Sequence, residues 1–344
     1  MRFSSSVVAA GLICALSTCL AAHTQVRPQA TGIVHTVEAD IAYEQFGQDS
    51  GHTPTIIVNG GPGFSHTYMY LTDVFTRKFA HDRTVTFYDQ RGIGNSKLLF
   101  ASAPQGMPAQ IADLEALRAK LRYDKIDLIG HSWGGEIAMA YAAAYPQHIQ
   151  HLVLVDSAAP KFGQTLFLFD QVFPDELAQD EQLAKSTHSE PEAGLHPELP
   201  STVNRLTSGR SHDGLMLRRY LARDFYSQER FQELTGDLSN EQIGEIMNND
   251  VNKAVVDAVE AVDLNDSIKK LRVPTLVMWG RFDINVAVLT GWKISQAIPG
   301  SKIVIYSKSG HFPFYEEESP FLRDLNQFLS EPRGVAVSTV VSEQ

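Results

Sequence analysis

The sequence is poor in cysteine and in positive charge. Its 344 residues include two cysteines, Cys14 and Cys19, and 29 lysines and arginines against 40 aspartates and glutamates, a formal net charge of −11. No block of basic residues is present, so we expect no nucleic-acid partner. Hydrophobic residues make up 43% of the chain, which is enough for a packed core and excludes global disorder.

The chain also lacks an apolar run long enough to cross a membrane. The longest such run, Val7 to Leu20, is shorter than the roughly 20 residues that a transmembrane helix needs. It is followed by Ala21 and Ala22, small residues that suit cleavage by signal peptidase after either one. We therefore expect residues 1–22 to be a signal peptide and the protein to be secreted or periplasmic. A membrane anchor is the alternative.

Both cysteines lie inside this N-terminal segment. Cleavage would remove them and leave a mature chain with no disulfide, no free thiol and no thiolate metal site. Lipidation of Cys19 is a further alternative, but Thr18 fits such a site poorly. We expect an exported protein with no stable membrane insertion after cleavage.

Short apolar runs alternate with helical patterns over much of the remaining chain. Continuous β-rich runs are typical of strands that are buried on both faces of a parallel sheet. The runs are Thr55–Val58, Val85–Tyr88, Ile126–Ile129, Leu152–Val155, Thr275–Trp279 and Ile303–Tyr306. Between them, Ile111 to Leu121 and Glu136 to Tyr145 have helical character. The alternation predicts an α/β fold with a mostly parallel, doubly wound sheet.

One region interrupts this alternation. Residues 161–264 are more polar and favour helix, and a strand pattern returns only after Val273-Pro274. We interpret 161–264 as a helical cap inserted between two parts of one core, 23–160 and 265–332. Residues 333–344 are expected to form a flexible tail.

The strongest chemical signal is the segment from Gly130 to Gly135, Gly-His-Ser-Trp-Gly-Gly. It follows a predicted strand and opens a predicted helix, the setting in which a G-x-S-x-G turn projects a nucleophilic serine above a sheet. The pattern predicts Ser132 as a nucleophile. The Trp133 amide, at the start of the helix, is placed to donate into an oxyanion hole.

A nucleophilic serine needs a base, and the base needs an acid that orients it. Asp283 and His311 each follow a predicted strand, in the chain order Ser, Asp, His that this type of hydrolase uses. Open α/β sheets collect functional groups at the carboxyl ends of their strands. We predict a triad of Ser132, Asp283 and His311, and a structural role for His131.

A second glycine-rich turn, Asn59-Gly60-Gly61-Pro62-Gly63, follows the first predicted strand of the core. Its amides are candidates for the second oxyanion donor. No Gly-Lys-Ser/Thr follows it, and His66 stands where a dinucleotide fingerprint needs its third glycine. His148 and His151 lack a third ligand. We predict no cofactor and no metal.

Three motifs together resemble the α/β-hydrolase superfamily and, more narrowly, the proline iminopeptidase group. They are the Gly60-Gly61-Pro62-Gly63 turn, the segment Asp89-Gln90-Arg91-Gly92-Ile93-Gly94-Asn95-Ser96, and the turn around Ser132. The resemblance covers residues 33–160 and 268–330. It implies an α/β-hydrolase fold with Ser132 as nucleophile, Asp283 as acid, His311 as base, and an oxyanion hole made by the Gly61 and Trp133 amides.

The chain departs from this group at two points. Asn59 occupies a position where the group usually has histidine. Aminopeptidases of this group resemble one another in using glutamates of the cap to hold the ammonium group of the substrate. No such motif is evident in this sequence. Candidates in the predicted cap are Glu176, Glu229, Glu233, Glu241 and Glu245.

The sequence thus predicts a serine hydrolase that cleaves an amide or ester of a small molecule or short peptide. The expected reaction is release of N-terminal proline or another residue from peptides. The alternative is an esterase, or another small-molecule hydrolase, with the same triad. A non-catalytic binding protein on a hydrolase scaffold is a distant alternative, since fold does not fix function. The oligomeric state is not predicted.

Overall fold

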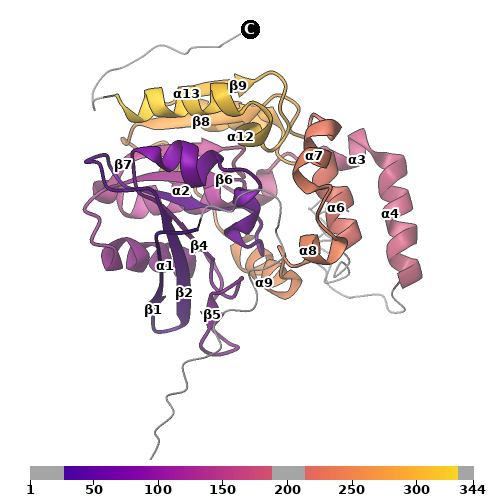
Figure 1. The fold of residues 1–344 in the computed structure, drawn as a ribbon, viewed down its shortest axis with the longest axis horizontal. Helices are drawn as coiled ribbons and strands as arrows, with labels where there is room; N and C mark the ends of the chain where they lie inside the picture. The colour runs from indigo at the N-terminus through magenta and orange to yellow at the C-terminus, as the bar shows by residue number, and fades with distance from the viewer. Residues whose placement is uncertain (1–26, 188–213, 332–344) are drawn as a thin grey trace, which may run out of the picture.

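The computed structural model describes residues 27–187 and 214–331, arranged as a core and a group of helices beside it (Figure 1). The expected signal peptide, both cysteines and the expected flexible tail lie outside these residues. No helix in the described part of the chain is long and apolar enough to cross a membrane.

Nine strands of the described chain form one sheet, in the order β1-β2-β4-β3-β6-β7-β8-β9, with β5 paired to β2. From β4 to β9 all neighbours are parallel, and β2 is antiparallel to β1, β4 and β5. The strands are β1 (Ala30–His35), β2 (Ala39–Phe46), β3 (Thr55–Val58), β4 (Val85–Tyr88), β5 (Lys97–Leu98), β6 (Ile126–His131), β7 (Ile149–Val155), β8 (Thr275–Gly280) and β9 (Lys302–Tyr306). The predicted α/β class and mostly parallel sheet are confirmed.

Both faces of the sheet are covered, because successive residues of a strand point to opposite faces. In β7, Leu152 and Leu154 pack into one core cluster, and Val153 and Val155 pack into the other. The first cluster is closed by α1 (Met107–Lys120), α2 (Trp133–Ala144) and α11 (Val288–Ala297). The second is closed by α13 (Glu318–Leu329) and the short helices η2 (Val74–Lys78) and η3 (Phe79–His81). This double cover explains the unbroken apolar runs.

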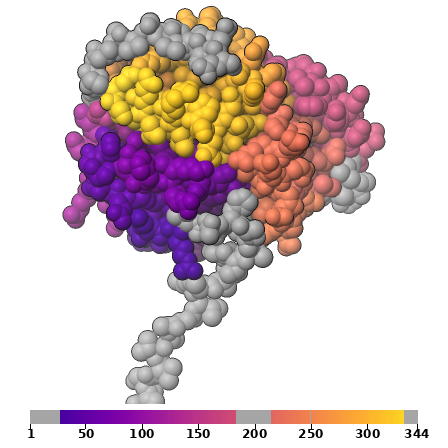
Figure 2. Space-filling model, turned by 45° about the horizontal axis from the view of Figure 1, so that its top comes forward, coloured from indigo at the N-terminus to yellow at the C-terminus, as the bar shows by residue number. Residues whose placement is uncertain are grey.

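Between β7 and β8 the described chain is helical and lies to one side of the sheet, in pink and orange (Figure 1). Its helices are α3 (Phe169–Val172), α4 (Pro174–Thr187), α6 (Gly214–Arg223), α7 (Gln228–Thr235), α8 (Asn240–Gly244), α9 (Asn249–Val259) and α10 (Asn265–Ile268). They have an apolar cluster of their own, which includes Phe169, Leu217 and Ile243. We call α3 to α9 the cap helices; Figure 2 shows the orange ones packed directly against the core. The exact bounds of the cap and of the two core parts stay predictions.

Candidate active site

Ser132 lies at the sharp turn between β6 and α2. Its backbone has φ 54° and ψ −125°, a left-handed conformation that is strained for a residue with a side chain. The two glycines that follow are sterically required. A Cβ on Gly134 would lie 2.2 Å from the Val58 carbonyl oxygen, and one on Gly135 would lie 2.0 Å from Ser157 Oγ. The helix can therefore approach the sheet closely only because these two side chains are absent.

The structure brings Asp283 and His311 together, although they are 28 residues apart in the chain. Asp283 follows β8, and His311 follows β9, the next strand in the sheet. His311 Nδ1 donates to Asp283 Oδ2 over 2.7 Å, and the Val286 amide donates to Asp283 Oδ1 over 2.8 Å. With its proton at Nδ1, the His311 ring keeps Nε2 as the acceptor that a general base needs.

His131 connects the Ser132 turn to the loop of His311. Its Nε2 donates to the His311 carbonyl oxygen over 2.9 Å, and the two rings are 4.7 Å apart between centroids. Its Nδ1 then accepts from the Tyr68 hydroxyl over 2.6 Å, and that hydroxyl accepts from the Gly60 amide over 2.6 Å. Burial, together with the neighbouring His311, holds the pKa of His131 well below its usual range. A neutral His131 thus bridges three loops.

The glycine-rich loop lies against the Ser132 turn. Gly61 and Gly63 have φ of 130° and 87°, which favour glycine. The Asn59 side chain holds the bend by donating to the carbonyl oxygens of Gly60 and Phe64, over 3.0 and 2.7 Å. An asparagine at this position therefore shapes the loop through its amide.

Gln90 fixes the same loop to helix α2. Its Nε2 donates to the Asn59 carbonyl oxygen over 2.8 Å, and its Oε1 accepts from Trp133 Nε1 over 3.0 Å. Gly61, Ser132 and Trp133 line one pocket. Both residues predicted to form the oxyanion hole therefore lie beside the predicted nucleophile.

Asp89, Gln90's neighbour, holds the start of η1 (His66–Tyr70), which follows the glycine-rich loop. The Asp89 carboxylate accepts from the Ser65 hydroxyl over 2.9 Å and from the His66 ring over 2.7 Å. Burial alone would lower the pKa of His66, but the charges of Asp89 and Glu44 and the hydrogen bonds to them outweigh it and raise it to about 9. The pair is an internal ion pair below the active site.

This ion pair predicts a pH dependence of stability. Because the pKa of His66 is raised in the folded chain, its contribution is fully present below the ordinary value of about 6.5 and is lost as the pH rises through about 9. We expect the free energy of unfolding to fall between pH 6.5 and 9, by up to about 3 kcal/mol. Urea unfolding of the wild type and His66→Gln at both pH values checks this. If the free energy of unfolding changes equally with pH in the wild type and in His66→Gln, the prediction is wrong.

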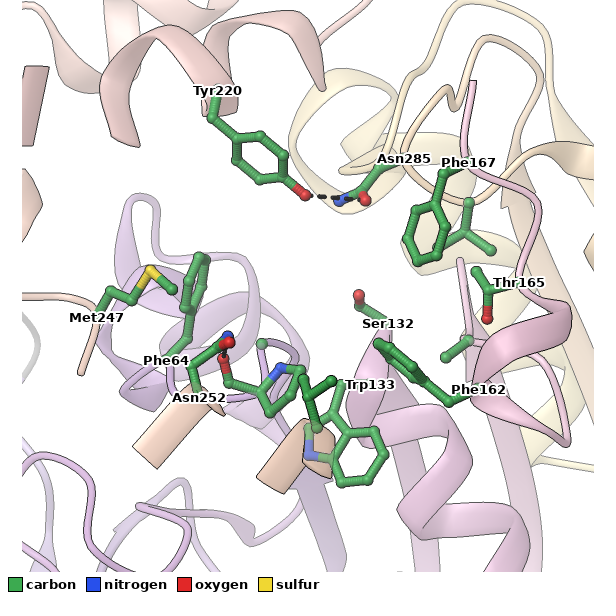
Figure 3. Close-up of a pocket in the computed structure, with 15 residues that line it drawn as sticks. Phe64, Ser132, Trp133, Phe162, Thr165, Phe167, Tyr220, Met247, Asn252 and Asn285 are labelled. Atoms are coloured by element: carbon green, nitrogen blue, oxygen red, sulfur yellow. Dashed lines mark hydrogen bonds between the residues drawn. The ribbon is translucent and has the colours of Figure 1, made fainter. Parts of the chain in front are cut away.

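The pocket around Ser132 lies between the core and the cap helices (Figure 3). Figure 3 shows the Ser132 hydroxyl pointing into the space between Tyr220 of α6 and Phe162 of the core side. The pocket is narrow, about 50 Å³, and mainly apolar. Its lining residues are Gly61, Pro62, Phe64, Ser132, Trp133, Ala158, Phe162, Thr165, Phe167, Tyr220, Met247, Asn252, Val256, Asn285 and Val286.

Acidic side chains do not reach this pocket from the described residues. The five glutamates singled out in the sequence, Glu176, Glu229, Glu233, Glu241 and Glu245, are all exposed, and none lines it. The acid behind the lining is Asp224, whose Oδ2 accepts from Asn285 Nδ2 over 3.3 Å. Burial raises the pKa of Asp224 well above its usual range, which favours its neutral form.

Several residues of the site gave no signal in the sequence. Three of them, Tyr68, Asn252 and Asn285, lie outside every motif found in the sequence. Gln90 belongs to the Asp89–Ser96 segment, but nothing in that segment indicates its contacts with the site. Asp156, directly after β7, is also buried beside Asp283 and His311. Only the folded chain brings these groups to the carboxyl edge of the sheet.

Comparison with known proteins defines the class. A family model described as alpha/beta hydrolase fold matches residues 53–318. The chain therefore belongs to the alpha/beta hydrolase family.

Within that family, curated proline iminopeptidases are among the similar sequences. The one from Heyndrickxia coagulans is 25% identical over 87% of this chain and 98% of its own. The one from Saccharolobus solfataricus is 28% identical over 85% of this chain and 89% of its own. The resemblance predicted from the three motifs is thus confirmed.

Among solved structures, the fold is similar to an enol-lactonase from Burkholderia xenovorans, with a TM-score of 0.64, 19% identity, and coverage of 85% of this chain and 97% of the other. It is also similar to an esterase from Exiguobacterium antarcticum, with a TM-score of 0.59, 20% identity, and coverage of 87% and 99%. At these identities the likeness shows the fold alone.

Proposed function

We propose that the protein is a serine hydrolase that cleaves esters or amides whose acyl part is uncharged and largely apolar. The observation that carries the substrate class is the pocket that holds Ser132. None of its lining residues among those described is acidic or basic. A substrate charge placed there would lose its water without gaining a partner, which is costly.

In the proposed reaction, Ser132 Oγ attacks the substrate carbonyl carbon while His311 Nε2 takes the hydroxyl proton. Asp283 keeps the His311 ring oriented and stabilises the imidazolium that forms. The carbonyl oxygen becomes an oxyanion that the Gly61 and Trp133 amides stabilise. The leaving group takes the proton from His311. A water molecule then attacks the acyl carbon of the acyl-enzyme while His311 Nε2 takes a proton from the water. The bond to Ser132 Oγ breaks, Oγ regains a proton from His311, and the acid is released.

One polar atom of the pocket is available to accept a hydrogen bond from a substrate. Asn252 Oδ1 is buried and has no hydrogen-bond partner among the described residues, whereas its Nδ2 donates to the Pro62 carbonyl oxygen. The Tyr220 hydroxyl already donates to Asn285 Oδ1 over 2.9 Å. A buried unpaired acceptor is stabilised by an N–H or O–H donor, so a substrate that places one such donor beside Asn252 is favoured.

Release of an N-terminal residue is the second candidate, because the similar curated sequences are proline iminopeptidases. Such a substrate carries an ammonium group next to the carbonyl that Ser132 attacks. Asp224 is the described acid behind the pocket, and no described residue forms a hydrogen bond with its Oδ1. This candidate requires Asp224, or an acid outside the described residues, to pair with the ammonium.

Two isosteric substrates distinguish the candidates: the 2-naphthylamides of cyclopentanecarboxylic acid and of proline. They have the same ring size, but only the prolyl compound is charged near neutral pH. We expect kcat/KM to be higher for the cyclopentyl compound, by about a hundredfold or more, because an unpaired buried charge costs several kcal/mol. The comparison is made at one pH with the same enzyme preparation.

The opposite order would favour the second candidate. If the prolyl compound is cleaved faster, and Asp224→Asn removes that preference while p-nitrophenyl acetate is still hydrolysed, then the ammonium is bound and the neutral-acyl proposal is wrong. The simple ester is a suitable control because it has no ammonium and depends on Ser132, His311 and the oxyanion hole.

We also propose that the protein is exported to the periplasm or secreted, since the apolar run from Val7 to Leu20 and the following alanines are typical of a signal peptide. Expression in a host that processes signal peptides should give a mature chain that begins near Ala22 or His23. N-terminal sequencing checks this, and an exported or cell-associated protein that starts at Met1 would contradict it.

A further inference from the structure

A second carboxyl group lies beside the predicted triad. Asp156 directly follows β7, and Asp283 follows β8, its parallel neighbour in the sheet. Asp156, Asp283 and His311 each present one oxygen or ring nitrogen, and these three atoms lie within 4.8 Å of one another. Asp156 and Asp283 are 0% and 2% exposed, so water does not screen one carboxyl from the other.

Two buried carboxyls this close repel each other when both are ionised, so the state in which one of them keeps its proton is favoured. Asp283 has two donors, the Val286 amide and His311 Nδ1. Asp156 has one, the Gly280 amide, which donates to Oδ1 over 2.9 Å, and no donor among the described residues reaches its buried Oδ2. Hydrogen-bond donors stabilise a carboxylate. The negative charge therefore resides on Asp283, and the proton on Asp156.

The backbone at Asp156 is also unusual. Its φ is 44°, a left-handed conformation that costs about 1–3 kcal/mol in a residue with a side chain. Its amide donates to the Met278 carbonyl oxygen over 3.0 Å, so the residue is held in place by β8. The strained backbone therefore places the Asp156 carboxyl at the end of the strand beside the site, with an Oδ2 that no donor among the described residues reaches.

We propose that Asp156 is a second acid for His311: its carboxyl is neutral while Asp283 is ionised, and it becomes the carboxylate beside the imidazole when the charge of Asp283 is removed. This inference rests on the serine hydrolase mechanism proposed above. In an Asp283→Asn enzyme, Asp156 releases its proton to solvent. His311 then takes the Ser132 proton, and the imidazolium is balanced by Asp156 instead of Asp283. Asp156 is a positioning residue, because it acts on the substrate only through His311.

Four other groups face Asp156 from the elements packed around it. They are Asp283 and His311, the Tyr306 hydroxyl of β9, and Glu316 of α12 (Pro313–Glu316). Burial and the charge of Asp283 raise the pKa of Asp156 well above its usual range, and Glu316 adds to the same effect. Removing the charge of Asp283 removes one of these causes, so the pKa of Asp156 falls in the Asp283→Asn enzyme.

The test compares three enzymes: Asp156→Asn, Asp283→Asn and the double variant. Asparagine at 156 keeps an oxygen to accept from the Gly280 amide, so it removes the ionisable group and retains this backbone contact. We expect Asp156→Asn to lose less kcat than Asp283→Asn, because Asp283 carries the charge in the wild type. We expect the double variant to be about tenfold or more slower than Asp283→Asn, since a nearby opposite charge shifts a pKa by about 1–3 units.

The pH profile gives a readout that a purely structural role would not change. A carboxylate beside the imidazole stabilises its protonated form, so the acid limb of kcat for Asp283→Asn should lie at higher pH than that of the double variant. Glu316, whose pKa is raised to about 7 by burial, also interacts with Asp156, so the comparison is repeated with Glu316→Gln in both enzymes to remove its titration.

Asp127→Asn in the Asp283→Asn background is the matched control. Asp127 is a buried carboxyl on the neighbouring strand β6, but it pairs with His151 over 2.7 Å at the other end of the strand. It should cause no further loss. Equal rates and equal acid limbs for Asp283→Asn and the double variant, both folded, would overturn the second-acid inference. A larger loss in Asp156→Asn than in Asp283→Asn would also overturn it, because Asp156 would then be the primary acid.

Ser132→Ala separates this inference from the mechanism on which it rests. If Ser132→Ala retains wild-type activity, the proposed serine mechanism fails. If Ser132→Ala is inactive but the acid variants do not differ as expected, the mechanism stands and only the role of Asp156 is wrong.

Discussion

Ser132→Ala should lower kcat/KM by about 10⁴-fold or more on any substrate that the enzyme cleaves, because the acyl-enzyme cannot form without the hydroxyl. His311→Ala should cause a loss of similar size. Residues that act as one unit are strongly non-additive, so the combined variant should be little slower than the worse single one. Steady-state kinetics on p-nitrophenyl acetate and the two naphthylamides measure these losses.

Thermal unfolding of each variant is the control for this prediction. Ser132 is 8% exposed and ends in a hydroxyl that faces the pocket, so its truncation should change the unfolding temperature little. Near-normal turnover by folded His311→Ala would show that another group is the base, and the assignment of His311 would then be wrong.

Gly134→Ala should have the second large effect, on both stability and rate. The new Cβ would lie 2.2 Å from the Val58 carbonyl oxygen and 2.5 Å from that of Asn59, so helix α2 must move away from β3 and the glycine-rich loop. We expect a loss of about 3 kcal/mol of unfolding free energy, at the upper end of what overpacking costs. We also expect a fall of about 10²-fold in kcat, since the Trp133 amide shifts from the oxyanion position. Urea unfolding and kinetics measure the two effects.

Gly106→Ser is the matched control for the added side-chain atoms. Gly106 precedes α1 as its N-cap, and its nearest neighbours would be 3.5 Å from a new Cβ, an ordinary contact. Serine is also a favourable N-cap residue. This variant should be as stable as the wild type or slightly more stable. A Gly134→Ala enzyme with wild-type stability and rate would contradict the steric account of the Ser132 turn.

The sequence predicted the central strands well because they are buried on both faces. Residues 55–58 and 85–88 match β3 and β4 at both ends. It did not predict β1 and β2, at the antiparallel edge of the sheet, where β1 is mostly exposed and β2 is mostly half-buried. Their apolar residues are too dispersed to form a continuous run, and pairing with a neighbouring strand, which the sequence does not display, decides their conformation.

Part of the candidate site was predictable because some of its residues directly follow strands that the sequence reveals. Asp283 and His311 follow recognisable strands in the expected order, so the topology that places them can be read from the chain. Tyr68 and His131 are 63 residues apart, and their contact depends on how η1 packs on the sheet. Asp156 follows a strand as Asp283 does, but only the geometry shows that no donor among the described residues reaches its second oxygen.

The central claim is that Ser132 is the nucleophile, and labelling with a fluorophosphonate probe tests it most directly, because the probe needs no knowledge of the natural substrate. The claim predicts one covalent adduct, located on the peptide that contains Ser132 by mass spectrometry, and no adduct on folded Ser132→Ala. Failure of the folded wild type to react, or an adduct that persists in Ser132→Ala, would contradict it.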